Sequence, residues 1–255
     1  MSLRRFHAPP ESFSREGSRV VLSREESQHL TQVLRLGAGA RVQVFDGEGR
    51  EFLCEVADAG ARGGALLEVV GRVEPPRPES PLKLTLAAAL LKGEKFDLVV
   101  QKATELGASR VVPVETARAG VRGARESGAA RRAERWRRIA LEAAKQSGRA
   151  RVPEVAAPIG LDELFAAEPG RADARRVMFA ERGGRGLAET VAAWGESTGE
   201  VVALVGPEGG WEDGEIEQAL AAGWEAVTLG GRTLRAETAC VVAVALLQHL
   251  CGDLR

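Results

Sequence analysis

The spacing of apolar residues divides the chain into two parts that meet near residue 75. In the first part, residues 41–45 and 51–56 alternate apolar and polar side chains, as strands with one buried face do. Residues 65–73 are another candidate strand. The stretch Asp46-Gly47-Glu48-Gly49 is typical of a hairpin turn, and a helix is expected over residues 23–34, with Ser23 as its N-cap. The pattern predicts a small β-rich domain of the barrel type.

A proline-rich stretch separates the two parts. Residues 74–81 contain four prolines, which remove backbone donors and stiffen the chain. We therefore predict an N-terminal domain over residues 1–74, a linker over 75–81 and a second domain over 82–255.

The second part alternates apolar runs with helical patterns. Strands are expected at residues 82–91, 111–114, 177–180, 201–205 and 226–229. Helices are expected at residues 94–106, 131–147, 187–194, 215–222 and 236–250. This alternation predicts an α/β domain with a mostly parallel sheet. The last of the helices is apolar all round, so it lies either at the centre of the domain or under a second subunit.

Composition narrows the class of protein. Of 255 residues, 44% are hydrophobic and 28% charged, which is typical of a soluble globular protein. No stretch approaches the ~20 apolar residues of a membrane span, and the first residues have no signal-peptide core, so we expect a cytoplasmic protein without membrane contact. The three cysteines and three histidines are scattered without metal-ligand spacing, so we expect reduced thiols and no metal.

The net charge of −1 hides a basic segment. Residues 118–151 hold ten Arg and one Lys against three Glu, and 11 − 3 gives +8. Residues 4–35 hold six Arg against four Glu, which gives +2. The excess favours a polyanionic partner such as a nucleic acid, and on charge alone a solvated helix face explains it as well.

Three glycine-rich breaks follow the last three expected strands. They are Glu181-Arg182-Gly183-Gly184, Gly206-Pro207-Glu208-Gly209-Gly210 and Gly230-Gly231-Arg232-Thr233-Leu234-Arg235. In a parallel sheet these breaks leave the same edge, where ligands bind, and glycine lets the backbone approach a ligand closely. They match neither a Walker loop nor a dinucleotide fingerprint. We predict one small-molecule pocket, in which Glu181 and Glu208 accept from hydroxyls, an amine or a cation.

Several motifs together resemble a known family. The stretches "LVGPEGGWEDGE", "LGGRTLRAETA", "LLKGEKFDLVVQKATELG" and "EAAKQSGR" resemble the bacterial 16S ribosomal RNA methyltransferases of the SPOUT class, which modify N3 of a uridine. The opening "RRFHAP" and "HLTQVLRL" are similar to that family's N-terminal segment, so the likeness covers nearly the whole chain. It implies a PUA-like RNA-binding β-barrel, an α/β domain with a trefoil knot, S-adenosylmethionine as cofactor, 16S ribosomal RNA of the small subunit as partner, and a homodimer.

The resemblance also assigns residues to roles. The cofactor would be held by Ala180, Glu181, Leu204, Gly206, Glu208, Gly209, Gly210, Leu229, Gly230 and Leu234. Arg4, Arg5 and Arg35 match basic positions at the family's N-terminal RNA-facing end, and Lys92 and Lys95 match its first α/β motif. We expect these residues to bind RNA, together with Arg132, Arg135 and Arg138 of the basic segment. At one position the chain departs from the family pattern, because Lys145 stands where an acidic residue is more common.

The chemistry calls for a cation and a base. Uracil N3 must lose a proton, and negative charge then spreads onto O2 and O4. Arg232 and Arg235 are candidates to stabilise that charge, and Glu237 is a candidate base; an ion pair or a helix cap explains these residues equally well. Two other functions stay open, a non-catalytic RNA-binding assembly factor and a SPOUT enzyme that acts on transfer RNA or a ribose hydroxyl.

Overall fold

The computed structural model describes residues 3–119, 126–167, 174–195 and 199–254. Within them the chain forms two compact units. Unit 1 runs to Glu79 and also takes in Ala144–Val152, and unit 2 holds Ser80–Ala143 and the chain from Pro153 onward. No helix or strand occurs between residues 74 and 82, the proline-rich stretch.

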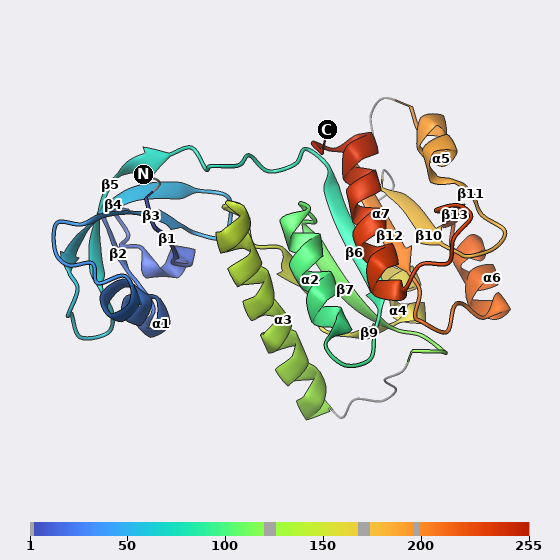
Figure 1. Cartoon of the computed structure of the whole chain (residues 1–255), viewed down its shortest axis with the longest axis horizontal. Helices are drawn as coiled ribbons and strands as arrows, with labels where there is room; N and C mark the ends of the chain where they lie inside the picture. Colours follow the sequence, from blue (N-terminus) through green and yellow to red (C-terminus); the bar gives the residue numbers. More distant parts are fainter. Residues whose placement is uncertain (1–2, 120–125, 168–173, 196–198, 255) are drawn as a thin grey trace. The chain divides into compact units, whose positions relative to one another are not determined.

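Unit 1 is built on a five-stranded mixed sheet in the order β1-β3-β4-β5-β2 (Figure 1). The strands are β1 (Arg5–His7), β2 (Arg19–Val21), β3 (Arg41–Phe45), β4 (Glu51–Asp58) and β5 (Leu66–Val73), and a 3₁₀ turn covers Pro10–Ser12. Strand β1 pairs with β3 in parallel, and the other pairs are antiparallel. The predicted hairpin turn is confirmed between β3 and β4. Asp46 Oδ1 closes it by accepting the backbone N–H groups of Glu48 and Arg50 at 2.8 and 3.0 Å.

Alternation along these strands produces the core of unit 1. Side chains of every second residue point to one face of a sheet, and here the inward face is apolar. The fully buried residues include Phe6, Val20, Leu22, Leu30, Val42, Val44, Cys54, Val56 and Leu67. Burial also raises the pKa of the Cys54 thiol to about 12, so this thiol is a core residue and not a nucleophile.

The predicted helix at residues 23–34 has an irregular second half. Helix α1 (Arg24–Gln28) begins at Ser23, whose hydroxyl accepts the Glu26 N–H at 3.2 Å, as expected. The next five residues, His29–Val33, form a π-helical turn. Arg35 then takes φ +53°, the one positive φ of a non-glycine residue in the part of the chain that the structure describes. The helix therefore ends in a left-handed residue that carries a long cationic side chain.

Unit 2 contains a parallel sheet in the order β11-β13-β10-β12-β6-β7-β8, with β9 beside β7. Its strands are β6 (Lys83–Ala89), β7 (Arg110–Glu115), β8 (Glu154–Val155), β9 (Ile159–Gly160), β10 (Arg175–Phe179), β11 (Arg185–Gly186), β12 (Glu200–Val205) and β13 (Glu225–Thr228). Strand β6 lies at the centre between β12 and β7 and is buried almost throughout, as its continuous apolar sequence predicted.

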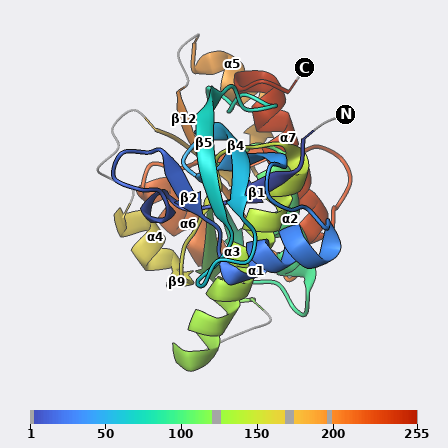
Figure 2. The ribbon, with the colours of Figure 1, turned by 90° about the vertical axis from the view of Figure 1, so that its left-hand side faces the viewer.

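Helices cover both faces of this sheet (Figures 1 and 2). They are α2 (Lys95–Glu105), α3 (Glu126–Ser147), α4 (Leu161–Ala167), α5 (Leu187–Ala193), α6 (Asp213–Ala221) and α7 (Ala236–Cys251). One face packs against Leu164 of α4 and Ala219 of α6 through Val112, Met178 and Leu204. Helices α2 and α7 pack together on the opposite face. The predicted α/β class is confirmed.

A buried glutamine fixes the far end of α7. Gln248 is fully buried, and its Nε2 donates to the Gly107 carbonyl at 3.1 Å. The Ser80 hydroxyl donates to its Oε1 at 2.7 Å. Gly107 has φ +89°, and a Cβ there would lie 2.8 Å from Gln248 Nε2, so the helix stop predicted at this glycine also leaves room for the contact. These bonds orient α7, whose first turn lies at the other end of the helix, at Ala236.

Candidate functional site

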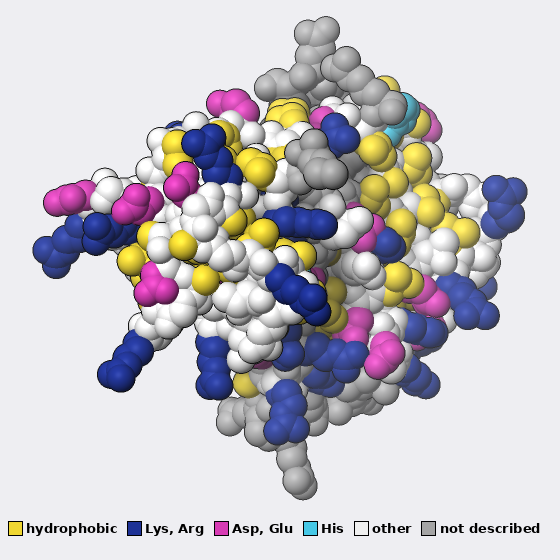
Figure 3. Space-filling view, turned by 60° about the vertical axis from the view of Figure 1, so that its left-hand side comes forward, with side chains coloured by type: hydrophobic (Ala, Val, Ile, Leu, Met, Phe, Trp, Pro, Cys, Tyr) yellow, Lys and Arg dark blue, Asp and Glu magenta, His cyan; other side chains and the backbone are white. Residues whose placement is uncertain are grey.

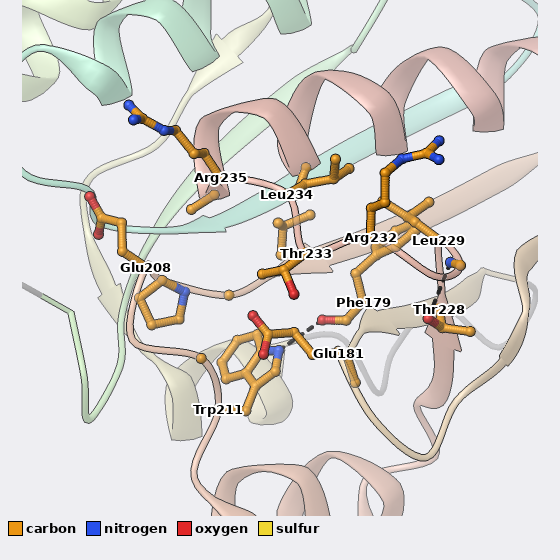
Figure 4. Close-up of a pocket in the computed structure, with 18 of the residues that line it drawn as sticks. Phe179, Glu181, Glu208, Trp211, Thr228, Leu229, Arg232, Thr233, Leu234 and Arg235 are labelled. Carbon is orange, nitrogen blue, oxygen red and sulfur yellow. Dashed lines mark hydrogen bonds between the residues drawn. The ribbon is translucent and has the colours of Figure 1, made fainter.

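The last three long strands of unit 2 end around one pocket, as the three glycine-rich breaks predicted. Strand β10 lies between β12 and β13, and all run parallel, so their carboxyl ends are neighbours. The cavity has a volume of about 520 Å³. It is lined by residues 179–181, 205–208, 210–211 and 228–236, together with Lys95 and Ala239 (Figure 4). It lies at the sheet edge where parallel α/β domains bind ligands.

Most of the predicted cofactor residues line this cavity. They are Ala180, Glu181, Gly206, Glu208, Gly210, Leu229, Gly230 and Leu234. The other two have different surroundings. Leu204 is fully buried in the core beside α4 and α6, and the Gly209 carbonyl accepts a hydrogen bond from Arg118. The Arg118 bond therefore helps to hold the Gly206–Gly210 loop, and Leu204 belongs to strand β12, which precedes it.

The first glycine of that loop is required by an aromatic ring that the sequence analysis did not select. A Cβ on Gly206 would lie 2.8 Å from Cε2 of Trp211. The indole Nε1 of Trp211 donates to the Phe179 carbonyl at 2.8 Å, and this bond fixes the ring against the end of β10. Trp211 follows the glycines directly in the sequence, and this position is the signal that could have identified it.

Two cations hold the same loop from different elements. Lys95, the first residue of α2, donates to Glu208 Oε1 at 3.0 Å, and its Nζ lies 3.9 Å from Glu237 Oε2. Burial pushes the pKa of Glu208 upward, but the hydrogen bond and charge of Lys95 outweigh it and lower that pKa below its usual value. Arg118, which follows β7, donates to the Gly209 carbonyl at 3.1 Å. Charge alone did not single out Arg118 from the basic segment.

Of the three predicted catalytic residues, Arg232 and Arg235 line the pocket, and Glu237 does not. Arg235 precedes α7, Arg232 lies on the preceding loop, and their guanidinium groups point to opposite sides in Figure 4. Glu237, in the first turn of α7, has a side chain only 12% exposed. Arg235 and Glu208 share one side of the pocket in this view, and Arg232 occupies the other.

The predicted RNA-binding residues differ in solvent exposure: some are exposed, and others are partly buried or form ion pairs within the chain. Figure 3 shows Lys and Arg side chains spread over the surface in view, with Asp and Glu side chains among them. Arg4, Arg35, Lys92 and Arg138 are exposed. Arg132 is half-buried, and Arg135 pairs with Glu94 and Asp97 at the start of α2. The residues outside the described ranges include Arg122 and Arg125 of the basic segment.

Arg5 has internal partners within unit 1. Its side chain is 11% exposed, and its guanidinium donates to both carboxylate oxygens of Glu51 at 2.9 Å. It also donates to the carbonyls of Lys145 and Arg149 at 3.0 and 3.1 Å. Lys145 in turn donates to Glu26 at 2.7 Å. Arg5 and Lys145 thus join residues 144–152 to the sheet, which gives Lys145 a partner that an acidic residue at this position would not have.

The described residues contain neither a metal-binding cluster nor a helix that could cross a membrane. These residues hold no group of three His, Cys, Asp or Glu side chains placed to bind a metal ion. None of their helices combines the length and apolar character needed to cross a membrane.

Comparison with known proteins connects this pocket to a family. Residues 78–248 match the model of an RNA methyltransferase domain, and residues 22–70 match that of an RNA methyltransferase PUA domain. The ribosomal RNA small subunit methyltransferase E of Synechocystis is 35% identical over 231 residues, which cover 91% of this chain and 73% of that protein. The protein of the same name from Mycobacterium bovis is 34% identical, and the match covers 89% of this chain and 85% of that protein.

A solved structure extends the likeness to the fold. The crystal structure of a ribosomal RNA small subunit methyltransferase E from Neisseria gonorrhoeae, bound to S-adenosylmethionine, matches with a TM-score of 0.86 and 34% identity. The match covers 99% of this chain and all of that one. The expected pair of a PUA-like unit and a SPOUT-type α/β unit is confirmed.

Proposed function

The chain belongs to the ribosomal RNA small subunit methyltransferase E family, and we propose that it transfers a methyl group from S-adenosylmethionine to N3 of a uridine in 16S ribosomal RNA. The observation that carries the proposal is the pocket: three glycine-rich strand ends enclose it, and the same fold in the N. gonorrhoeae relative is bound to this cofactor.

The pocket fits S-adenosylmethionine in size and in chemistry. A cavity of about 520 Å³ lies within the usual range for small-molecule sites. The backbone after β10, β12 and β13 offers N–H and C=O groups for an adenine and a ribose, and Glu181 and Glu208 offer carboxylates. When bound, the cofactor supplies a methyl group on a positively charged sulfur. The absence of a phosphate-binding lysine motif agrees with a ligand that carries no phosphate.

The chain must activate a poor nucleophile. A bond forms between the methyl carbon and uridine N3 while the sulfur–carbon bond breaks, and the N3 proton leaves to a base. Negative charge on O2 and O4 grows as that proton is lost, so a fixed cation beside the uracil lowers the barrier. Holding N3 in line with the methyl group supplies a further part of the rate.

We assign the cation to Arg235 and the base to Glu237. The guanidinium groups of Arg232 and Arg235 point to opposite sides of the pocket, so one uracil can meet only one of them. Arg235 shares its side with Glu208, which Lys95 bonds, and Lys95 also lies 3.9 Å from Glu237. The Glu237 Oε2 atom is buried and makes no hydrogen bond among the described residues, and the Lys95 ammonium lies 3.9 Å away; we infer that this oxygen takes up the N3 proton.

Exposed cations supply the RNA contacts. We assign this role to Arg4 and Arg35 in unit 1 and to Lys92 and Arg138 in unit 2, because their charges are exposed. Arg5, Lys95 and Arg135 form ion pairs with carboxylates of the same chain, so we do not assign them to RNA binding. Because the proposed substrate is ribosomal RNA, we infer that the protein acts in the cytoplasm.

A second copy of the chain completes the assembly. Leu246 and Leu250 are one turn apart on α7 and leave 36% and 38% of their surface exposed. The first turn of the same helix lines the pocket through Ala236 and Ala239. A homodimer that covers this face of α7 therefore borders the site. Light scattering on a Leu246→Glu variant tests it, and we expect a monomer where the wild type is a dimer.

Nucleoside analysis tests the reaction. The purified protein is incubated with S-adenosylmethionine and 30S subunits, or free 16S RNA, from a strain that lacks its own enzyme of this family. Digestion and mass spectrometry should show 3-methyluridine, at most one per RNA. Methylation at a ribose hydroxyl, or of transfer RNA only, would contradict the proposal. RNA binding without any methyl transfer would instead make the protein an assembly factor.

A further inference from the structure

The two carboxylates that line the pocket differ in their partners. Glu208 bonds Lys95 at 3.0 Å, so its charge is largely offset within the chain. Glu181, two residues beyond the end of β10, makes no hydrogen bond or ion pair with the described residues, and its side chain is exposed. The pocket therefore holds one carboxylate whose charge is available to a ligand.

The surroundings of Glu181 leave this charge directed into the cavity. In Figure 4 its carboxylate points to the middle of the pocket, while the guanidinium groups of Arg232 and Arg235 point away on opposite sides. Gly210 lies close to it, because a Cβ on that glycine would be 3.8 Å from Glu181 Oε2. The next residue is Trp211, whose ring is fixed by its bond to Phe179.

A carboxylate next to an indole attracts positive charge. The carboxylate does so by its own charge, and the indole by the negative face of its ring. The apolar side chains of the lining cannot supply this attraction, and backbone carbonyl groups supply only partial charges. The ligand of the proposed function carries a positive sulfur before methyl transfer and a neutral thioether afterwards. At the sulfur, the site would thus meet a positive charge in the substrate and none in the product, whereas the α-ammonium group of the amino-acid part is the same in both.

We propose that Glu181 is a specificity residue that makes the pocket bind S-adenosylmethionine more tightly than its product, S-adenosylhomocysteine. This inference rests on the proposed function. Two unit charges about 5 Å apart, at effective dielectric constants of about 40 to 80, change an affinity roughly 4- to 16-fold. After each transfer this part of the affinity disappears, which speeds release of the product and limits inhibition by it.

Calorimetry with three ligands tests the proposal. The ligands are S-adenosylmethionine, S-adenosylhomocysteine and sinefungin, in which a charged amine replaces the sulfonium methyl. We expect the wild type to prefer both cationic ligands over the neutral one by roughly 4- to 16-fold. Glu181→Gln should lose this preference through weaker binding of the two cations, with little change for the neutral ligand. Glu217→Gln, an exposed site on α6 that does not line the pocket, is the matched control.

The outcomes distinguish a failure of the role inferred for Glu181 from a failure of the proposed methyltransferase function. An equal loss for all three ligands would overturn the inference, because it would make Glu181 a partner of a group that they share, such as the ribose. A wild type that binds none of them would overturn the proposed function itself. If Glu181→Gln fails to fold, Glu181→Asp keeps the charge and must keep the preference. A loss of preference in folded Glu181→Asp would also count against the proposal.

Discussion

Lys95 and Glu208 should act on cofactor affinity as a pair. Lys95 Nζ lies 3.0 Å from Glu208 Oε1, and this bond ties the cofactor loop to the start of α2. In Lys95→Met or Glu208→Gln the loop loses that tie, so each variant should bind S-adenosylmethionine more weakly. The double variant should lose little more than either single one, because the same contact is already gone.

The solvent exposure of Lys95 and Glu208 sets the expected size of their coupling energy. In water, two charges at this distance interact by about 1.4 kcal/mol. Lys95 and Glu208 are 38% and 28% exposed, so solvent screens them, and exposed pairs contribute only about 0.2–1 kcal/mol. We expect a coupling energy near the upper end, about 0.5–1 kcal/mol, or roughly a two- to fivefold change in affinity.

The pH dependence has a definite sign. Because the pKa of Glu208 is lowered, the contribution of its carboxylate is fully present above the ordinary value of 4.5 and is lost as the pH falls through the lowered value. The difference between wild type and Lys95→Met should therefore be constant from pH 6 to 8 and shrink only in acid.

Two binding assays on the same variants decide the role of Lys95. Calorimetry gives cofactor affinity and filter binding gives RNA affinity, with Lys102→Met as control, since Lys102 pairs with Glu105 further along α2 and does not line the pocket. Strictly additive losses of cofactor affinity would refute the paired action. Normal cofactor affinity with weaker RNA binding would restore the RNA role predicted from the sequence.

Three further variants probe the loop, the chemistry and the RNA surface. Gly206→Ala should weaken cofactor binding at least tenfold by calorimetry, because its methyl group displaces the ring beside it, whereas Gly214→Ala, with open space around it, should bind normally. Arg235→Ala should bind cofactor and RNA but transfer methyl groups roughly 10²–10³-fold more slowly in single-turnover assays, with partial recovery as the pH rises. A wild-type rate would leave Arg235 a structural residue. Charge reversal at Arg4 and Arg138 should weaken RNA binding and flatten its salt dependence, and unchanged binding would make both merely solvated.

The regular elements were largely predictable because their signals are local. Strand β6 is a continuous apolar run, and β3 and β4 alternate around a hairpin turn, so each shows its type within ten residues. Strands β1, β2, β8, β9 and β11 and helix α4 were missed, since segments of two to seven residues carry too little periodicity. The knot stays a prediction, because periodicity holds no information on threading, and so does the dimer, because one chain does not contain its partner.

The site was predictable in its backbone but only partly in its side chains. Glycine-rich breaks after successive strands are visible in the sequence, and they do enclose the pocket. The partners of the charged residues are not visible, because they lie far away along the chain. Lys95 and Glu208 are 113 residues apart, and Arg5 and Glu51 are 46 apart. From the sequence alone, a basic side chain that forms an ion pair within the chain cannot be distinguished from one that is available to bind RNA.

The central position of β6 has a consequence for how the molecule folds. Its partner strand β12 aligns Val201 with Leu84, so the pair closes a loop of 201 − 84 = 117 residues. The entropy of such a closure is lost before the contacts form, which makes parallel pairings of this kind slow. Because β12 also carries the glycine loop, no early, locally folded intermediate can present the pocket. Recovery of cofactor binding after dilution from denaturant should therefore follow the slowest phase of refolding. The rate at which binding returns would then measure the rate at which the whole sheet forms.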